Sequence, residues 1–93
     1  MKQWHLVTYD VRDDKRLRRT ARILEGYGVR VQYSVFRCRL SARELERLRW
    51  ELDKVLAPDD DLLVISLCER CVLKIRQTGT RVWPEEPERF LIV

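Results

Sequence analysis

The chain begins with an apolar strand that ends in a carboxylate, and this combination limits how the rest of the chain can fold. Residues 4–9 form a β-branched and aromatic run of strand length. Alternation along this strand leaves both of its faces largely apolar, so both faces should be covered. Asp10 follows directly, although aspartate is depleted in strands. Asp10 is therefore either a turn residue or a ligand at the end of the strand.

A strongly basic amphipathic helix is predicted over residues 13–27. Asp13 is placed to cap its N-terminus, and Gly28 stands where a left-handed C-terminal cap would lie. The positions expected to face the core recur at helical spacing: Leu17, Thr20, Ala21, Leu24 and Tyr27. Residues 12–43 hold ten Lys or Arg against three Asp or Glu. This surplus indicates a phosphate-facing surface, although codon bias or adaptation to heat would also explain so many arginines.

The next stretch, residues 29–40, is β-rich and changes phase in its middle. Its apolar residues occupy odd positions up to Val35 and even positions from Phe36 onward. This slip predicts either a bulge in one strand or a bend between two strands near residues 33–36.

A second helix is predicted to begin at Ser41. Ser41 and Glu44 match the capping box, in which each side chain satisfies a free backbone N–H. One apolar stripe follows at helical spacing: Leu45, Leu48, Leu52 and Val55. Pro58 is expected to end the helix, and Trp50 lies off the stripe, where it flanks the core or meets a partner.

The remaining third of the chain contains two apolar runs. After an acidic turn at residues 59–61, residues 62–67 form a run that is apolar except for Ser66, which is typical of a central strand. Residues 68–77 favour one short helical turn, and residues 84–87 favour a stiff extended linker. Phe90–Val93 is a bare apolar strand that we expect to add to a sheet edge.

This order of elements predicts an α+β fold, a ferredoxin-like βαββαβ sandwich with an antiparallel sheet and two helices on one face. The 93 residues support one domain, residues 1–93. The other face of the sheet is left open and apolar, so a symmetric homodimer is expected. Residues 83–93 are then an extended C-terminal segment at the dimer interface, and the terminal strand pairs with the dimer partner.

The sequence disfavours membrane insertion, secretion and several kinds of active site. No apolar run approaches the ~18 residues of a membrane span, and no signal peptide is evident, so the cytoplasm is the expected location. The only histidine, His5, is expected to be packed inside the first strand, and Ser34 has no histidine or lysine that would activate it. Cys68 and Cys71 form a lone C-x-x-C motif, for which structural thiols are favoured over a disulfide or a metal bridge.

Two motifs together resemble the CRISPR-associated protein 2 family. The first is Tyr9-Asp10-Val11 followed by Asp13-Asp14-Lys15, and the second runs from Tyr27-Gly28 through Arg30-Val31-Gln32-Tyr33-Ser34-Val35-Phe36. The resemblance implies a ferredoxin-like homodimer of the metal-dependent nuclease type. It also implies a role in acquiring new spacers alongside CRISPR-associated protein 1, the integrase.

The resemblance places the metal-binding aspartate of the family at Asp10 and its other functional residues at Tyr9, Arg30 and Phe36. A two-fold axis beside the first strand would bring a second Asp10, and two carboxylates can hold one Mg²⁺ ion or another divalent cation. From the sequence alone, an aspartate in the position of Asp10 is more often a turn or cap residue than a metal ligand. Phe36 is as well suited to the core as to an active role. Four helix arginines are expected to hold phosphates, unless they only form a solvated face: Arg16, Arg18, Arg19 and Arg22.

Two functions remain open at this point. The first is a metal-dependent endonuclease that cleaves phosphodiester bonds of single-stranded RNA or double-stranded DNA as a homodimer. The alternative is a non-catalytic dimeric scaffold that bridges the CRISPR integrase and binds protospacer DNA with its basic helices. An RNA-recognition module and a metal chaperone of this fold are both disfavoured, because their strand and cysteine motifs do not occur at the required positions.

Overall fold

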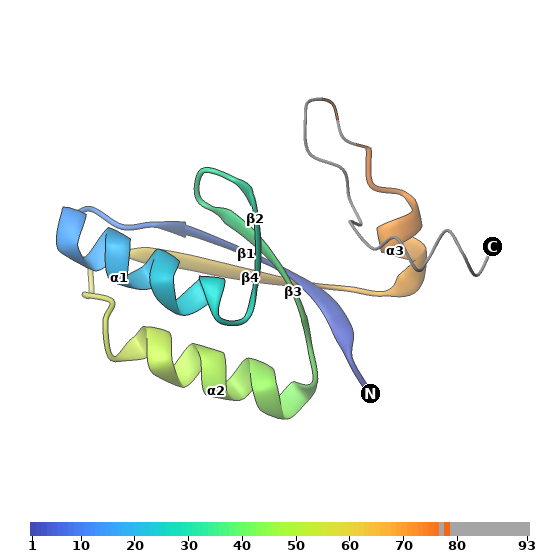
Figure 1. Cartoon of the computed structure of the whole chain (residues 1–93), viewed down its shortest axis with the longest axis horizontal. Coiled ribbons are helices and arrows are strands. Elements are labelled where there is room, and N and C mark those ends of the chain that lie inside the picture. Colours follow the sequence, from blue (N-terminus) through green and yellow to red (C-terminus); the bar gives the residue numbers. More distant parts are fainter. Residues whose placement is uncertain (77, 79–93) are drawn as a thin grey trace.

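A four-stranded antiparallel sheet carries two helices on one of its faces, and a short third helix follows its last strand (Figure 1). The structure is a computed structural model that describes residues 1–76 and residue 78. In chain order the elements are β1 (Gln3–Asp10), α1 (Asp14–Glu25), β2 (Gly28–Gln32), β3 (Val35–Leu40), α2 (Ala42–Asp53), β4 (Asp61–Leu67) and α3 (Glu69–Leu73). The strand order is β2-β3-β1-β4. The predicted α+β, ferredoxin-like βαββαβ sandwich is confirmed.

Alternation along β1 separates a covered face of the sheet from an open one. His5, Val7 and Tyr9 are buried beneath the helices, whereas their neighbours along the strand are only half-buried or exposed. The hydrophobic core lies on this covered face, and its fully buried members come from strands β1 and β3 and helices α1 and α2: Val7, Leu24, Phe36, Cys38, Leu48 and Leu52. His5 is packed as expected, with its Nδ1 2.9 Å from Ser66 Oγ.

Helix α1 starts where the sequence predicts and ends earlier. Asp13 caps its N-terminus, because its carboxylate accepts a hydrogen bond of 3.0 Å from the Arg16 N–H. The C-cap is Gly26, which has a right-handed φ of −77°. The prediction that Gly28 is a left-handed cap is therefore wrong. Gly28 opens β2, and it must be glycine because a Cβ atom there would lie 2.1 Å from the Arg37 carbonyl oxygen.

The β-rich stretch contains two strands. β2 and β3 pair as an antiparallel hairpin, and Tyr33 and Ser34 form the turn between them. The register also shifts between Arg30 and Gln32, so both a bend and an irregularity account for the change of phase.

Helix α2 confirms the capping box. The Ser41 N–H donates to Glu44 Oε1 at 2.8 Å, and the Glu44 N–H donates to Ser41 Oγ at 3.2 Å. The helix ends at Asp53, several residues before Pro58, so the prediction that Pro58 ends it is wrong. Trp50 is exposed, and the Lys54 ammonium lies 3.4 Å from the centre of its ring.

Strand β4 is an edge strand of the sheet that the described residues form, which corrects the prediction of a central strand. The apolar run alternates in burial: Leu62 and Val64 pack against the core, whereas Leu63 and Ile65 are 56% and 39% exposed. A continuous apolar run is thus compatible with an edge strand, because its outward residues lie on an open apolar face. We call this the open face and define it by Trp4, Leu6, Leu63 and Ile65.

The last part of the chain confirms one prediction and leaves others outside the described residues. Helix α3 is the predicted short helical turn after β4. The predicted linker at residues 84–87, the extended segment at residues 83–93 and the terminal strand Phe90–Val93 are not among the described residues. None of the helices in the described part of the chain is long and apolar enough to cross a membrane.

Candidate functional site

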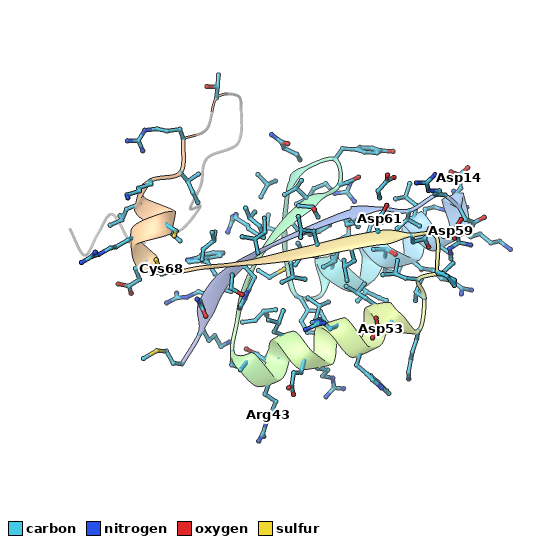
Figure 2. The ribbon with its side chains drawn as sticks, turned by 180° about the vertical axis from the view of Figure 1, so that it is seen from behind. Asp14, Arg43, Asp53, Asp59, Asp61 and Cys68 are labelled. Atoms are coloured by element: carbon cyan, nitrogen blue, oxygen red, sulfur yellow. The ribbon has the colours of Figure 1, made fainter. Side chains whose placement is uncertain are left out.

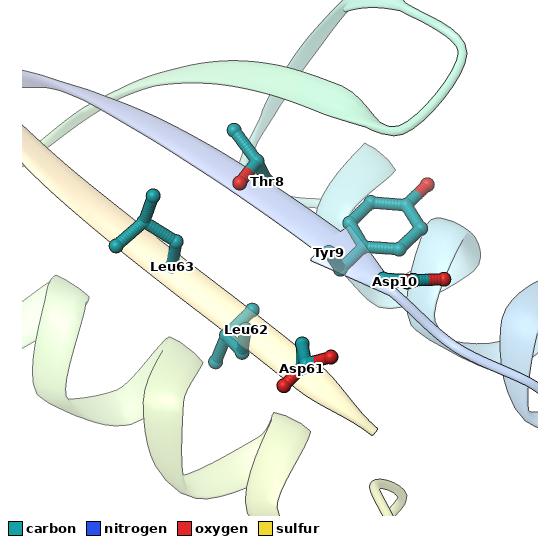
Figure 3. Close-up of a pocket in the computed structure, with 6 residues that line it drawn as sticks. All are labelled: Thr8, Tyr9, Asp10, Asp61, Leu62 and Leu63. Atoms are coloured by element: carbon teal, nitrogen blue, oxygen red, sulfur yellow. The ribbon is translucent and has the colours of Figure 1, made fainter. Parts of the chain in front are cut away.

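Two carboxylates meet at one end of the sheet. Asp10, the last residue of β1, lies directly opposite Asp61, the first residue of β4, in the antiparallel register. Residues paired in this way project from the same face of a sheet, and both of these aspartates are exposed. They line a shallow depression of about 320 Å³ together with Thr8, Tyr9, Leu62 and Leu63 (Figure 3).

This pair fits a hard divalent cation better than a soft one. Carboxylate oxygens are ligands that Mg²⁺ accepts, and Mg²⁺ usually binds one or two of them while retaining several waters. The described residues contain no group of three or more histidine, cysteine, aspartate or glutamate side chains that could hold a metal ion. One chain therefore offers Asp10 and Asp61, and water, phosphate oxygens or a second copy would complete the coordination shell.

A buried carboxylate, Asp60, fixes the chain beside this pair. Its side chain is fully buried and accepts hydrogen bonds from Arg16 Nε at 2.8 Å, the Ala57 N–H at 2.9 Å and the Arg12 N–H at 3.1 Å. The Arg16 guanidinium and the Ala57 N–H hold the pKa of Asp60 well below its usual range. Asp60 is the residue before β4, and its contacts tie the start of β4 to the segment after β1. Asp60 therefore fixes the positions of Asp10 and Asp61.

The structure separates the four predicted phosphate-binding arginines into two groups. Arg16 forms a two-point contact with the buried Asp60 and lies 3.8 Å from Asp59, so its guanidinium has an intramolecular role. The other three arginines lie on α1 with exposed side chains: Arg18, Arg19 and Arg22. These three are the stronger candidates for contact with a phosphate backbone.

Tyr9, Arg30 and Phe36 come together on the covered face. The rings of Tyr9 and Phe36 are 6.3 Å apart, and the Arg30 guanidinium carbon lies 5.2 Å from the centre of the Phe36 ring. Burial raises the pKa of Tyr9, and the nearby charge of Arg30 opposes this shift. Phe36 is fully buried, and the Arg30 guanidinium packs against its ring.

The four residues assigned to catalysis from the sequence therefore divide between the two faces. Asp10 faces the open side with Asp61, and the cluster of Tyr9, Arg30 and Phe36 lies on the covered side. A second small pocket of about 130 Å³ lies beside this cluster and includes two basic side chains; it is lined by Tyr9, Leu17, Arg18, Ala21, Arg30 and Tyr33.

The sequence-based interpretation missed the roles of Asp60 and Asp61. Both belong to the run of three aspartates that we interpreted as an acidic turn. Asp60 is 44 residues from Arg16 in the chain, and Asp61 becomes the partner of Asp10 only through strand pairing. A carboxylate immediately before an apolar run, like the one immediately after the first run, is the only local signal for Asp61.

Comparisons with known proteins relate the sequence to one family. The family described as CRISPR associated protein Cas2 matches residues 1–75. The chain is 44% identical over 83 residues to CRISPR-associated endoribonuclease Cas2 3 of Synechocystis, which covers 89% of this chain and 86% of that protein. It is 38% identical over 92 residues to CRISPR-associated endoribonuclease Cas2 1 of Archaeoglobus fulgidus, covering 94% and 98% of the two chains.

Solved structures share the fold. A hypothetical protein from Thermus thermophilus superposes with a TM-score of 0.78 at 34% identity, covering 86% of this chain and 94% of that one. Cas2 of Streptococcus pyogenes gives a TM-score of 0.73 at 30% identity, covering 82% and 99%. A chain of a structure entitled partial Cas6-RT-Cas1–Cas2 complex gives 0.66 at 27% identity, covering 83% and 90%.

Proposed function

This chain belongs to the CRISPR-associated protein Cas2 family, and we propose that it is a CRISPR adaptation protein whose homodimer cleaves phosphodiester bonds in nucleic acid. The pairing of the exposed residues Asp10 and Asp61 at one end of the sheet carries this proposal. The relatives named above are endoribonucleases, which makes single-stranded RNA the first substrate to test and double-stranded DNA the second.

The proposed site uses oxygen ligands and arginines in separate roles. Asp10 and Asp61 would hold Mg²⁺, which supplies polarisation of a phosphodiester and lowers the pKa of a bound water. Asp60 orients both ligands through the contacts described above. Arg18, Arg19 and Arg22 bind the sugar-phosphate backbone without reading its sequence. His5 is buried and faces Ser66, so it does not serve as the base.

A second copy of the chain would complete the site. Leu63 and Ile65 lie on β4 beside Asp61 and expose apolar surface on the open face. Covering this surface with the same surface of a partner removes it from water, and it brings a second pair of carboxylates close to the first. The homodimer is thus part of the proposed function.

The test is cleavage of matched RNA and DNA substrates with and without Mg²⁺. Asp10→Asn and Asp61→Asn should each lower the rate by at least about 100-fold, because each removes a charged ligand while keeping the shape of the side chain. Asp53→Asn is the matched control, since Asp53 is an exposed acid at the end of α2 (Figure 2). Full Mg²⁺-dependent cleavage by folded Asp10→Asn protein would refute the assignment.

A second function, a scaffold that bridges the integrase and holds protospacer DNA, is favoured by the exposed arginines of α1. These arginines need no metal to bind DNA, and the similar Cas1–Cas2 complex contains a chain of this fold. The two functions separate in one comparison. If Asp10→Asn abolishes cleavage in vitro but leaves spacer acquisition intact in cells, the scaffold role is the relevant one.

A further inference from the structure

Two cysteines face each other at the far end of β4 from the paired carboxylates. Cys68 follows β4 and precedes α3, and Cys71 lies within α3. Their Sγ atoms are 3.3 Å apart, and both residues are exposed. Figure 2 shows Cys68 at the opposite end of the sheet from Asp61. The proposed nuclease site does not use either thiol.

The third cysteine provides an internal comparison. Cys38 is fully buried in the core, and burial raises its pKa to about 11. Hydrogen bonding with the backbone N–H and the side chain of Cys71 lowers the pKa of Cys68. Since the thiolate is the reactive form, the exposed Cys68 with its lowered pKa is better suited to reaction than the buried Cys38.

The spacing of the pair suits a disulfide bond. An S–S bond is ~2.05 Å long, so the two Sγ atoms need to approach by about 1.3 Å from their separation of 3.3 Å. Cys68 is the N-cap of α3 and Cys71 lies in the first turn of that helix, so rotation of exposed side chains achieves most of this approach. A metal site is less suited, because the described residues offer no third ligand beside the pair.

We infer that Cys68 and Cys71 are a reversible dithiol switch that closes to an intramolecular disulfide on reaction with a low-molecular-weight disulfide. In the first step the Cys68 thiolate attacks the small disulfide, forms a mixed disulfide and releases one small thiolate. In the second step the Cys71 thiolate attacks Cys68 Sγ and releases the second small thiolate. The dithiol loses two electrons and two protons, and the small disulfide is reduced to two thiols.

The test uses the full chain, reduced and then treated with oxidised glutathione under native conditions. Remaining thiols are alkylated after unfolding, and the protein is digested with trypsin without reduction. Trypsin cleaves after Arg70, between the two cysteines, so a disulfide would hold residues 55–70 and 71–74 together as one species. The intact protein should then carry one alkyl group instead of three, because only Cys38 remains a thiol.

Variants identify the order of the two steps. Cys71→Ser should stop at a stable mixed disulfide between glutathione and Cys68. Cys68→Ser should react more slowly, and Cys38 in the native protein should react at least about tenfold more slowly than the pair. A stable mixed disulfide on the wild-type chain, disulfide-linked pairs of chains on a non-reducing gel, or closure only in denaturant would each overturn the inference.

Discussion

The covered and open faces of the sheet are built from the same strands but are completed in different ways. On the covered face, β1 and β3 bury Val7 and Phe36 completely beneath the two helices. On the open face, the neighbouring positions expose Leu63 and Ile65 and end in Asp10 and Asp61. The covered face is therefore completed within one chain, whereas the open face leaves two carboxylates and an apolar surface exposed. Stability and function are thus expected to respond to substitutions on different faces.

The strongest test of this difference compares an apolar truncation on each face. Phe36→Ala should lower the free energy of unfolding by ~3–5 kcal/mol, because it opens a cavity in the core. Leu63→Ala should lower it by less than ~1 kcal/mol, since Leu63 is 56% exposed. Urea denaturation at low protein concentration measures both, and dilution keeps self-association from contributing. Equal losses would mean that the open face is already covered within the chain.

A second test asks whether the buried carboxylate supports the carboxylates on the open face. Asp60→Asn should lower the melting temperature at neutral pH, because the side chain loses its charged contact with Arg16. The folded-state pKa of Asp60 is depressed, so its contribution is complete above the unfolded value of ~3.9 and is lost as the pH falls below it. The difference in melting temperature should therefore stay constant above about pH 5 and shrink below about pH 4.

The neighbouring acid provides the control for this test. The Asp59 side chain is 68% exposed, so Asp59→Asn should leave the pH profile close to that of the wild type. Asp60→Asn should also weaken Mn²⁺ binding by the folded protein, because Asp10 and Asp61 lose their common anchor. If Mn²⁺ affinity is unchanged while the melting temperature falls, Asp60 has only a structural role.

A third test examines the open face directly. Leu63→Ser should weaken self-association by at least about tenfold, or ~1.4 kcal/mol, if a second copy covers this face. Trp50→Ser is the matched control, because Trp50 exposes a similar fraction, 58%, on helix α2 at the other side of the molecule. Sedimentation velocity over a range of concentrations measures both. The same loss for both variants, or for neither, would contradict a dimer that uses the open face.

Local patterns in the sequence predicted the elements and their order, because each helix and strand carries its own periodicity and caps. Asp13 and the Ser41–Glu44 capping box are such signals, and both are formed in the structure. The position of β4 at the sheet edge was not predicted, since a continuous apolar run does not say which neighbour covers each face. The role of Gly28 was predicted wrongly for a related reason. Strand pairing brings Arg37 and Cys38 close to Gly28, and the local sequence does not show this approach.

The candidate site was predicted in part, and the missing part depends on long-range contacts. The resemblance predicted site roles for Asp10, Tyr9, Arg30 and Phe36, and the fold brings Tyr9 and Arg30 against the Phe36 ring. It did not identify Asp61, whose pairing with Asp10 follows from the register of β1 and β4. The contact of Arg16 with Asp60 also could not be predicted, because four adjacent basic residues on one helix are equivalent until a distant acid selects one of them.

The smallest expected effect is on the binding of duplex DNA. It tests whether α1 or α2 contacts the phosphate backbone. Arg18→Gln and Arg22→Gln should each weaken binding of duplex DNA a few-fold and reduce the slope of log affinity against log salt by ~0.9. Arg49→Gln on the exposed surface of α2 should leave the slope unchanged. Arg16→Gln should lower the melting temperature but leave the slope unchanged, because its guanidinium is held by Asp60. Filter binding between 50 and 200 mM salt measures the slopes. A lower slope for Arg16→Gln would show that nucleic acid displaces Asp60, in which case the anchor of Asp10 and Asp61 would respond to the substrate itself.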